Sequence, residues 1–173
     1  PEVVNAMRSH LDAWWEDVED DAFKIHRITI GSTKENPTML TACDWYQVFI
    51  DMQKQARAGE KKSGYWYVVV DQPGTYDFEL RRWPIESGYG LNDSIPETQY
   101  FDGVQPPGVS FPIAGARIIV GDEEQSAPVT PNDKSARFTF ELEAGENSIL
   151  TYFDDANGER ILGAYWLYVN RRG

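Results

Sequence analysis

The segment Arg81-Arg82-Trp83-Pro84 carries the side chains best suited to hold a ligand. Guanidinium groups bind anionic groups through paired hydrogen bonds, and they stack on aromatic rings. Arg82 falls on the apolar face of the strand predicted just before it, where a guanidinium must find a partner or reach the rim. We therefore predict a site for an anionic or sugar ligand formed by Arg81, Arg82, Trp83 and Tyr89. The alternative, favoured by the number of local acids, is a salt bridge.

Cys43 is the only cysteine, so the chain cannot form an internal disulfide. A catalytic thiol needs a neighbouring base, and the only histidines are His10 and His26. No recognisable motif ties either of them to the cysteine. We therefore predict that Cys43 is a small buried residue just before a helix cap.

The run Asp154-Asp155-Ala156-Asn157-Gly158-Glu159 has the composition of a calcium-binding loop. In such a loop an acidic ligand stands five positions before the glycine, but Phe153 occupies that place, and no downstream glutamate completes the pattern. Asn-Gly is instead a strong signal for a tight β-hairpin. The run predicts a solvated hairpin turn and no metal site.

Composition excludes several classes of partner. The chain has 173 residues, 41% of them hydrophobic, and a formal net charge of −12. Nucleic acids and anionic membranes attract basic surfaces, so we expect neither as a partner, and no apolar run is long enough to span a bilayer. The chain begins at Pro1 without a signal pattern, so we expect it to be a piece of a longer protein.

Residues 1–19 are predicted to form a helix within a leading segment, 1–22, at the junction with another domain. Apolar residues recur there at steps of three and four. The stripe consists of Val3, Val4, Met7, Leu11, Trp14, Trp15 and Val18. We predict that this stripe, from Val4 onward, is an interface, either with a neighbouring domain or with a second copy in a homodimer.

The centre of the chain reads as a β-hairpin. Residues 65–70 form an unbroken aromatic and β-branched run, Asp71-Gln72-Pro73-Gly74 is a turn, and residues 75–81 alternate. Tyr76, Phe78 and Leu80 share the buried face of the second strand. A second helix is predicted over residues 45–58, capped by Asp44 and ended by Gly59.

Further short strands are predicted at residues 24–30, 116–120, 136–142, 148–153 and 161–169, with a long functional or disordered loop at 84–112. This pattern is typical of an antiparallel β-sandwich of jelly-roll type, here over residues 23–173, with an N-terminal helix and one additional helix.

Several segments resemble the C-terminal region of bacterial arylsulfatases. They cover most of the chain and include Leu11-Asp12-Ala13-Trp14-Trp15, Ile30-Gly31-Ser32, Glu35-Asn36-Pro37-Thr38-Met39-Leu40-Thr41-Ala42-Cys43-Asp44-Trp45, Tyr76-Asp77-Phe78-Glu79-Leu80-Arg81-Arg82-Trp83-Pro84, Gln125-Ser126-Ala127-Pro128-Val129 and Gly163-Ala164-Tyr165. The resemblance implies a periplasmic or secreted parent that hydrolyses sulfate esters with a formylglycine nucleophile and a calcium ion.

The catalytic parts of that family are missing from this chain. Its maturation motif is Cys-x-Pro-x-Arg (or a serine in place of the cysteine), whereas Cys43 is followed by Asp44, Trp45, Tyr46 and Gln47. We therefore expect no catalytic residue and no cofactor here, and a non-catalytic domain that packs on the sulfatase catalytic domain of the same chain and shapes its entrance for a sulfated saccharide. The alternative is a carbohydrate-binding β-sandwich module. An exposed apolar stripe would favour docking, and a groove lined by aromatics would favour sugar binding.

Overall fold

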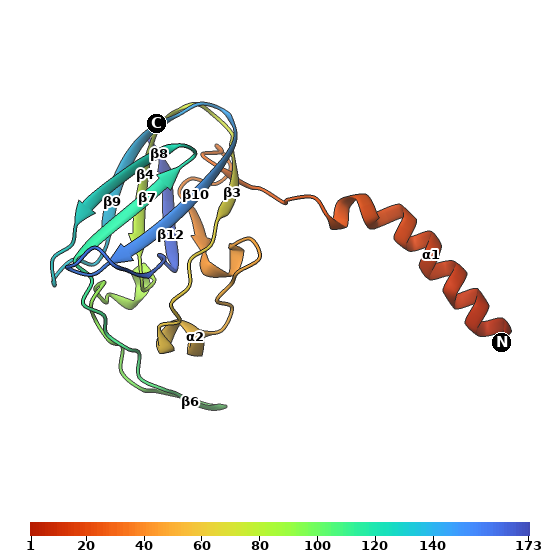
Figure 1. Ribbon diagram of the computed structural model, residues 1–173, viewed down its shortest axis with the longest axis horizontal. Coiled ribbons are helices and arrows are strands. Elements are labelled where there is room, and N and C mark those ends of the chain that lie inside the picture. The colour runs from red at the N-terminus through yellow and green to blue at the C-terminus, as the bar shows by residue number, and fades with distance from the viewer.

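Two β-sheets pack face to face in the computed structural model, which describes residues 1–173 (Figure 1). The first sheet has the order β1-β3-β10-β7-β8, with β11 also paired to β10, and the second has the order β2-β12-β4-β9. All pairings are antiparallel except that of β1 with β3. The predicted mostly β, antiparallel sandwich with two helices is confirmed.

The strands of the first sheet are β1 (Ile28–Ile30), β3 (Trp66–Val70), β7 (Gly115–Val120), β8 (Glu123–Pro128), β10 (Gly145–Asp154) and β11 (Arg160–Leu162). Those of the second are β2 (Thr38–Thr41), β4 (Gly74–Arg81), β9 (Ala136–Leu142) and β12 (Trp166–Arg171). Outside the sheets lie α1 (Glu2–Ala22), η1 (Ala42–Asp44), α2 (Gln53–Ala58), η2 (Ile85–Ser87) and a separate hairpin of β5 (Thr98–Tyr100) and β6 (Gly103–Gln105).

The core lies between the two sheets and follows the alternation of the sequence. On β4 the side chains of Tyr76, Phe78 and Leu80 are fully buried, as predicted, while Asp77 between them is only half-buried. Phe78 meets Phe140 of β9 edge to face, with ring centroids 5.4 Å apart. The inner faces of both sheets belong to one cluster of 29 buried hydrophobic residues. Each sheet therefore supplies the cover that the other needs.

The predicted hairpin of β3 and β4 is wrong, because these two strands belong to different sheets. Residues 71–73 carry the chain across the sandwich, and Gly74 takes a positive φ of 144° as β4 begins. The backbone of β3 is paired with β1 and β10, and that of β4 with β12 and β9. Both strands carry apolar side chains that need burial, and crossing lets these side chains face each other across the core.

The predicted helix over 45–58 is reduced to its last turns, α2. Asp44 does not cap a long helix, because its carboxylate accepts hydrogen bonds from the backbone N–H and hydroxyl of Thr41 at 2.8 and 2.9 Å. Trp45 is extended and buried, and Gln47 has a positive φ of 60°, which no helix permits. Gly59 ends α2 in the left-handed conformation, as predicted.

The other strands follow the predictions in part. The strand expected at 24–30 is only Ile28–Ile30, and the expected 161–169 strand is split between β11 and β12, which lie in different sheets. The break at 163–165 occurs where the N–H of Ala164 donates to the hydroxyl of Thr151 at 3.0 Å. The sequence analysis missed β2 and β8, and the 84–112 loop contains η2 and the β5–β6 hairpin.

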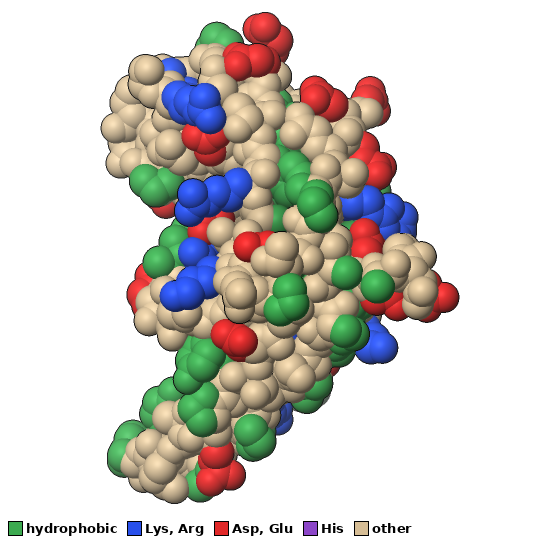
Figure 2. Space-filling view, turned by 90° about the vertical axis from the view of Figure 1, so that its left-hand side faces the viewer, with side chains coloured by type: hydrophobic (Ala, Val, Ile, Leu, Met, Phe, Trp, Pro, Cys, Tyr) green, Lys and Arg blue, Asp and Glu red, His purple; other side chains and the backbone are tan.

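The helix α1 projects away from the sandwich and buries none of its residues (Figure 1). It extends three residues beyond the predicted end at residue 19, as far as Ala22. No helix in the structure combines the length and apolar character needed to cross a membrane. On the face of the molecule seen in Figure 2, acidic and basic side chains lie interspersed.

We predict that Phe78→Ala lowers the free energy of unfolding by about 3–5 kcal/mol, because it empties a fully buried aromatic site. Asp77→Ala should cost less than about half of that, since its carboxylate is partly exposed and bonds Arg172 and Thr139 at the surface. Chemical denaturation of both variants measures the difference. Equal losses would contradict the observed alternation of faces.

Candidate functional site: a groove at one end of the sandwich

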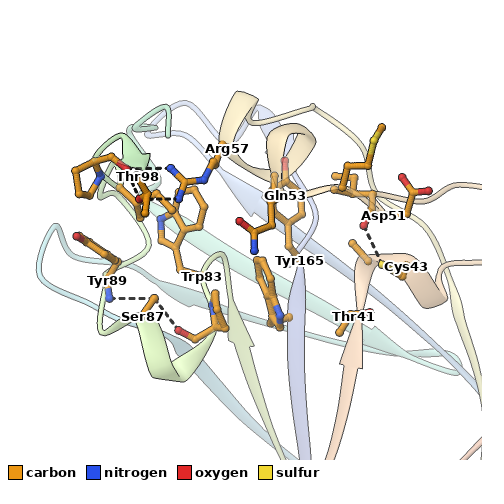
Figure 3. A pocket seen from close by; sticks show the side chains of 18 of the residues that line it. Thr41, Cys43, Asp51, Gln53, Arg57, Trp83, Ser87, Tyr89, Thr98 and Tyr165 are labelled. Atoms are coloured by element: carbon orange, nitrogen blue, oxygen red, sulfur yellow. Dashed lines mark hydrogen bonds between the residues drawn. The ribbon is translucent and has the colours of Figure 1, made fainter. Parts of the chain in front are cut away.

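A groove of about 420 Å³ opens beside α2, between the η1 region and the segment that follows β4 (Figure 3). Its walls come from parts of the chain that are distant in sequence. They consist of Thr41, Ala42, Cys43, Ile50, Asp51, Met52, Gln53, Ala56, Arg57, Trp83, Pro84, Ser87, Tyr89, Ile95, Pro96, Thr98, Tyr100, Tyr165 and Trp166. The groove has more apolar than polar lining residues, and it contains most of the polar group types that bind small ligands.

Five aromatic side chains line the groove, and they differ in how far they are exposed. Trp83 and Tyr165 are buried at 2% and 1% exposure, so they present only an edge or part of a face. Tyr89 and Trp166 are half-buried, and Tyr100 of the β5–β6 hairpin is 44% exposed. Burial raises the pKa of Tyr165, whose hydroxyl donates to the carbonyl of Glu60 at 2.6 Å. The exposed rings are therefore those nearer the rim.

Arg57 of α2 lies in the groove wall and is only 5% exposed. Its Nη1 donates to the carbonyls of Pro96 at 2.9 Å and Pro106 at 2.7 Å, and its Nη2 donates to the hydroxyl of Thr98 at 3.2 Å. The guanidinium thus ties α2 to the loop that carries the β5–β6 hairpin. The sequence analysis missed this residue, because nothing in the local sequence distinguishes it from a solvated helix arginine.

Arg82, which we predicted to contact a ligand, is instead completely enclosed. Its guanidinium lies 4.6 Å from the ring centroids of both Trp83 and Phe111, and it donates to the carbonyls of Asp93 and Val109. Burial lowers its pKa to about 10. Since no face of Arg82 is open, its role is to hold the wall of the groove from behind.

Arg81 does not reach the groove either. Its Nε donates to Glu79 at 2.5 Å, and both side chains are largely buried, so the alternative of a structural ion pair is the correct one for this residue. Burial of the Glu79 carboxyl opposes ionisation, but the hydrogen bond and charge of Arg81, together with Ser135 and Arg137, outweigh it, so the pKa of Glu79 is lowered. Of the four predicted ligand residues, only Trp83 and Tyr89 line the groove.

Cys43 is exposed at one end of the groove, which corrects the prediction of a buried residue. The η1 turn points its side chain outward, where its thiol lies 3.2 Å from the carbonyl of Ile50. Neither His10 nor His26 lines the groove, so no histidine stands beside this thiol. The groove therefore brings together groups that can bind a ligand, and no histidine is among them.

The 154–159 run forms a hairpin turn between β10 and β11, as predicted. The carboxylate of Asp155 accepts from the backbone N–H groups of Asn157 at 2.8 Å and Glu159 at 2.9 Å, which lowers its pKa. Asp154 is bound by Arg117 through two hydrogen bonds of 2.6 and 2.8 Å. The carboxylates of Asp154 and Asp155 are thus occupied within the sheet and the turn.

No protein-family model matches the chain, and no curated protein matches it. Three solved structures overlap with it loosely. A ruminal GH26 endo-beta-1,4-mannanase is 14% identical with a TM-score of 0.41, over 80% of this chain and 26% of that one. A Podospora anserina GH26-CBM35 beta-(1,4)-mannanase is 9% identical with a TM-score of 0.40, over 80% and 28%. Pika GITRL is 12% identical with a TM-score of 0.33, over 79% and 98%. The chain spans roughly a quarter of the two mannanase chains, and at these TM-scores we draw no functional conclusion from the three.

Proposed function

We propose that the chain is a non-catalytic carbohydrate-binding module whose site is the groove beside α2. The observation that carries this proposal is the lining, in which aromatic rings stand next to polar side chains. A sugar offers apolar C–H faces and hydroxyl groups together, so it needs rings to lie against and hydrogen-bond partners around them. Tyr89, Tyr100 and Trp166 supply accessible rings, and their phenol and indole groups add polar contacts.

The polar lining has groups that are free to bind. The side chains of Gln53 and Asp51 make no hydrogen bond within the chain, and Gln53 reaches into the middle of the groove (Figure 3). Thr98 and Ser87 also line the groove near its aromatic end, but their hydroxyl groups are already hydrogen-bonded within the chain, to Arg57 and the carbonyl of Pro96 and to the carbonyl of Pro84 and the N–H of Tyr89. A volume of about 420 Å³ lies in the lower part of the range for small-molecule sites, which suits a short stretch of a glycan.

We predict that the protein binds neutral or charged oligosaccharides, and that Tyr100→Ala and Gln53→Ala each weaken binding by about tenfold, the effect of one lost stacking or hydrogen-bonding contact. Calorimetric titration with oligosaccharides of mannan, xylan, cellulose and polygalacturonate measures the affinity, and tryptophan fluorescence gives a second readout. Tyr65→Ala, which removes an exposed tyrosine outside the groove, is the matched control. A wild-type protein that binds no glycan at millimolar concentration contradicts the proposal.

A second candidate function is favoured by α1. The chain would be the accessory domain of a larger sulfatase, secreted or periplasmic, whose calcium and formylglycine lie in the catalytic domain. The support is the resemblance together with the exposed stripe, in which Met7, Leu11 and Trp14 are 52–68% exposed and touch nothing in the sandwich. Contiguous exposed apolar side chains on a helix are typical of an interaction surface. Sugar binding and docking use different parts of the molecule and can coexist.

We predict that Leu11→Asp with Trp14→Ser loosens the two domains of a full-length parent and lowers its melting temperature by several degrees. The chain alone should change by less than about 0.5 kcal/mol, because α1 contributes nothing to its core. Ser9→Asp with Ala13→Ser, on the opposite side of the same helix, is the matched control. If the chain alone unfolds and the parent is indifferent, α1 belongs to the sandwich and the docking hypothesis fails.

A further inference from the structure

Two buried arginines stand at one end of the groove without a carboxylate partner. The guanidinium of Arg57 in the wall is bonded only to two carbonyls and a hydroxyl, and that of Arg82 behind Trp83 only to two carbonyls. The ion pairs of the structure, in which an acid lies within 4.0 Å of an arginine or lysine, include neither Arg57 nor Arg82. Carbonyls satisfy N–H donors but leave the net positive charge in place.

The lack of a carboxylate partner is notable in this chain. It has 28 acidic residues against 16 lysines and arginines, so acids are available to pair with a buried cation. Buried charges are costly, and in folded proteins they are almost always paired. Asp93 is the acid that interacts electrostatically with Arg82, but its carboxylate accepts a hydrogen bond from the N–H of Gly90 at 2.7 Å and makes no ion pair with the guanidinium. The positive charge at this end of the groove is therefore left for a group that the chain itself does not supply.

The acidic group of the groove lies at the opposite end. Asp51 is the only aspartate or glutamate among the lining residues. Figure 3 places it beside Cys43, while Arg57 stands with Thr98, Trp83 and Tyr89 at the other end and Gln53 lies between. The groove thus has a cationic, aromatic end and an acidic end. A ligand with one negative substituent has a single favourable orientation in such a groove.

We infer that the groove selects saccharides that carry an anionic substituent, a carboxylate or a sulfate ester, and holds that substituent at the Arg57 end. This inference rests on the proposed carbohydrate-binding function. The Nε of Arg57 has no hydrogen-bond partner within the chain and is not fully enclosed, so it remains available to a ligand beside the hydroxyl of Thr98. Arg82 adds charge from behind the Trp83 ring, where water cannot screen it.

The test compares pairs of ligands that differ only in charge. Tetragalacturonate is titrated against its fully methyl-esterified form, and a sulfated carrageenan tetrasaccharide against its desulfated form, by calorimetry at fixed salt. We expect at least one anionic member to bind about tenfold more tightly than its neutral partner. The carboxylate arm and the sulfate arm show which substituent is preferred. Equal affinity within both pairs overturns the inference and leaves the proposed function standing, whereas no binding of any of the four overturns both.

Two variants locate the effect. Arg57→Gln should bring the ratio of the affinities for the anionic and the neutral member close to one, whereas a loss of wall structure alone would weaken both members by the same factor and leave that ratio unchanged. Asp51→Asn should strengthen binding of the anionic member, because it removes the only acid from the lining. The carboxylate of Asp51 makes no hydrogen bond or ion pair within the chain, so this variant keeps the inference testable even if Arg57→Gln unfolds the loop. Asp122→Asn, an exposed acid outside the groove, is the control, and an equal effect of Asp122→Asn and Asp51→Asn overturns the inference.

Discussion

The whole structure depends on the crossing of the chain from β3 to β4, because it sets the inner faces of the two sheets against each other. Trp66 and Val68 on one side and Phe78 and Leu80 on the other are fully buried within one cluster. Had the two strands paired as a hairpin, their apolar faces would have lain in one sheet and needed a separate cover. The crossing also brings the end of β4, with Arg82 and Trp83, next to the segment around Tyr165, where the groove opens.

The groove exists because two arginines hold a loop that has little regular structure of its own. The segment between β4 and β7 is held by hydrogen bonds from two buried guanidinium groups. Arg82 donates to the carbonyls of Asp93 and Val109, and Arg57 donates to those of Pro96 and Pro106. A cation enclosed between two rings gains about 0.5–2 kcal/mol per ring, which offsets part of the cost of burying it. The same two cations shape the wall of the groove and give that end its charge, so its architecture and its expected selectivity have one origin.

The sequence predicts the local periodicity of this fold well and its long-range contacts poorly. Alternation identified the buried faces of β4 and β9, and the Asn157-Gly158 turn identified the β10–β11 hairpin. A turn between two apolar strands reads the same whether they pair or cross, so the β3–β4 error could not be avoided locally. The helix expected at 45–58 failed because Trp45 packs on Trp66 and Tyr165, a tertiary contact that outweighs helix propensity. The groove joins residues more than a hundred positions apart, and Arg57 carries no local signal.

The leading helix α1 receives no stabilisation from packing on the sandwich. An isolated helix of 21 residues is held only by its own hydrogen bonds, and its stability in water is marginal. Glu19, Asp20 and Asp21 lie at its C-terminal end, where negative charge opposes the helix dipole, and no basic residue stands in the last turn. Trp14, Trp15 and Phe23 meet one another but nothing in the sandwich. A helix that opposes its own dipole and exposes its apolar stripe gains stability from a surface that covers the stripe. In the docking proposed for α1, the acidic end disfavours a parallel pair of copies, and charge complementarity favours a partner surface with basic residues around an apolar strip.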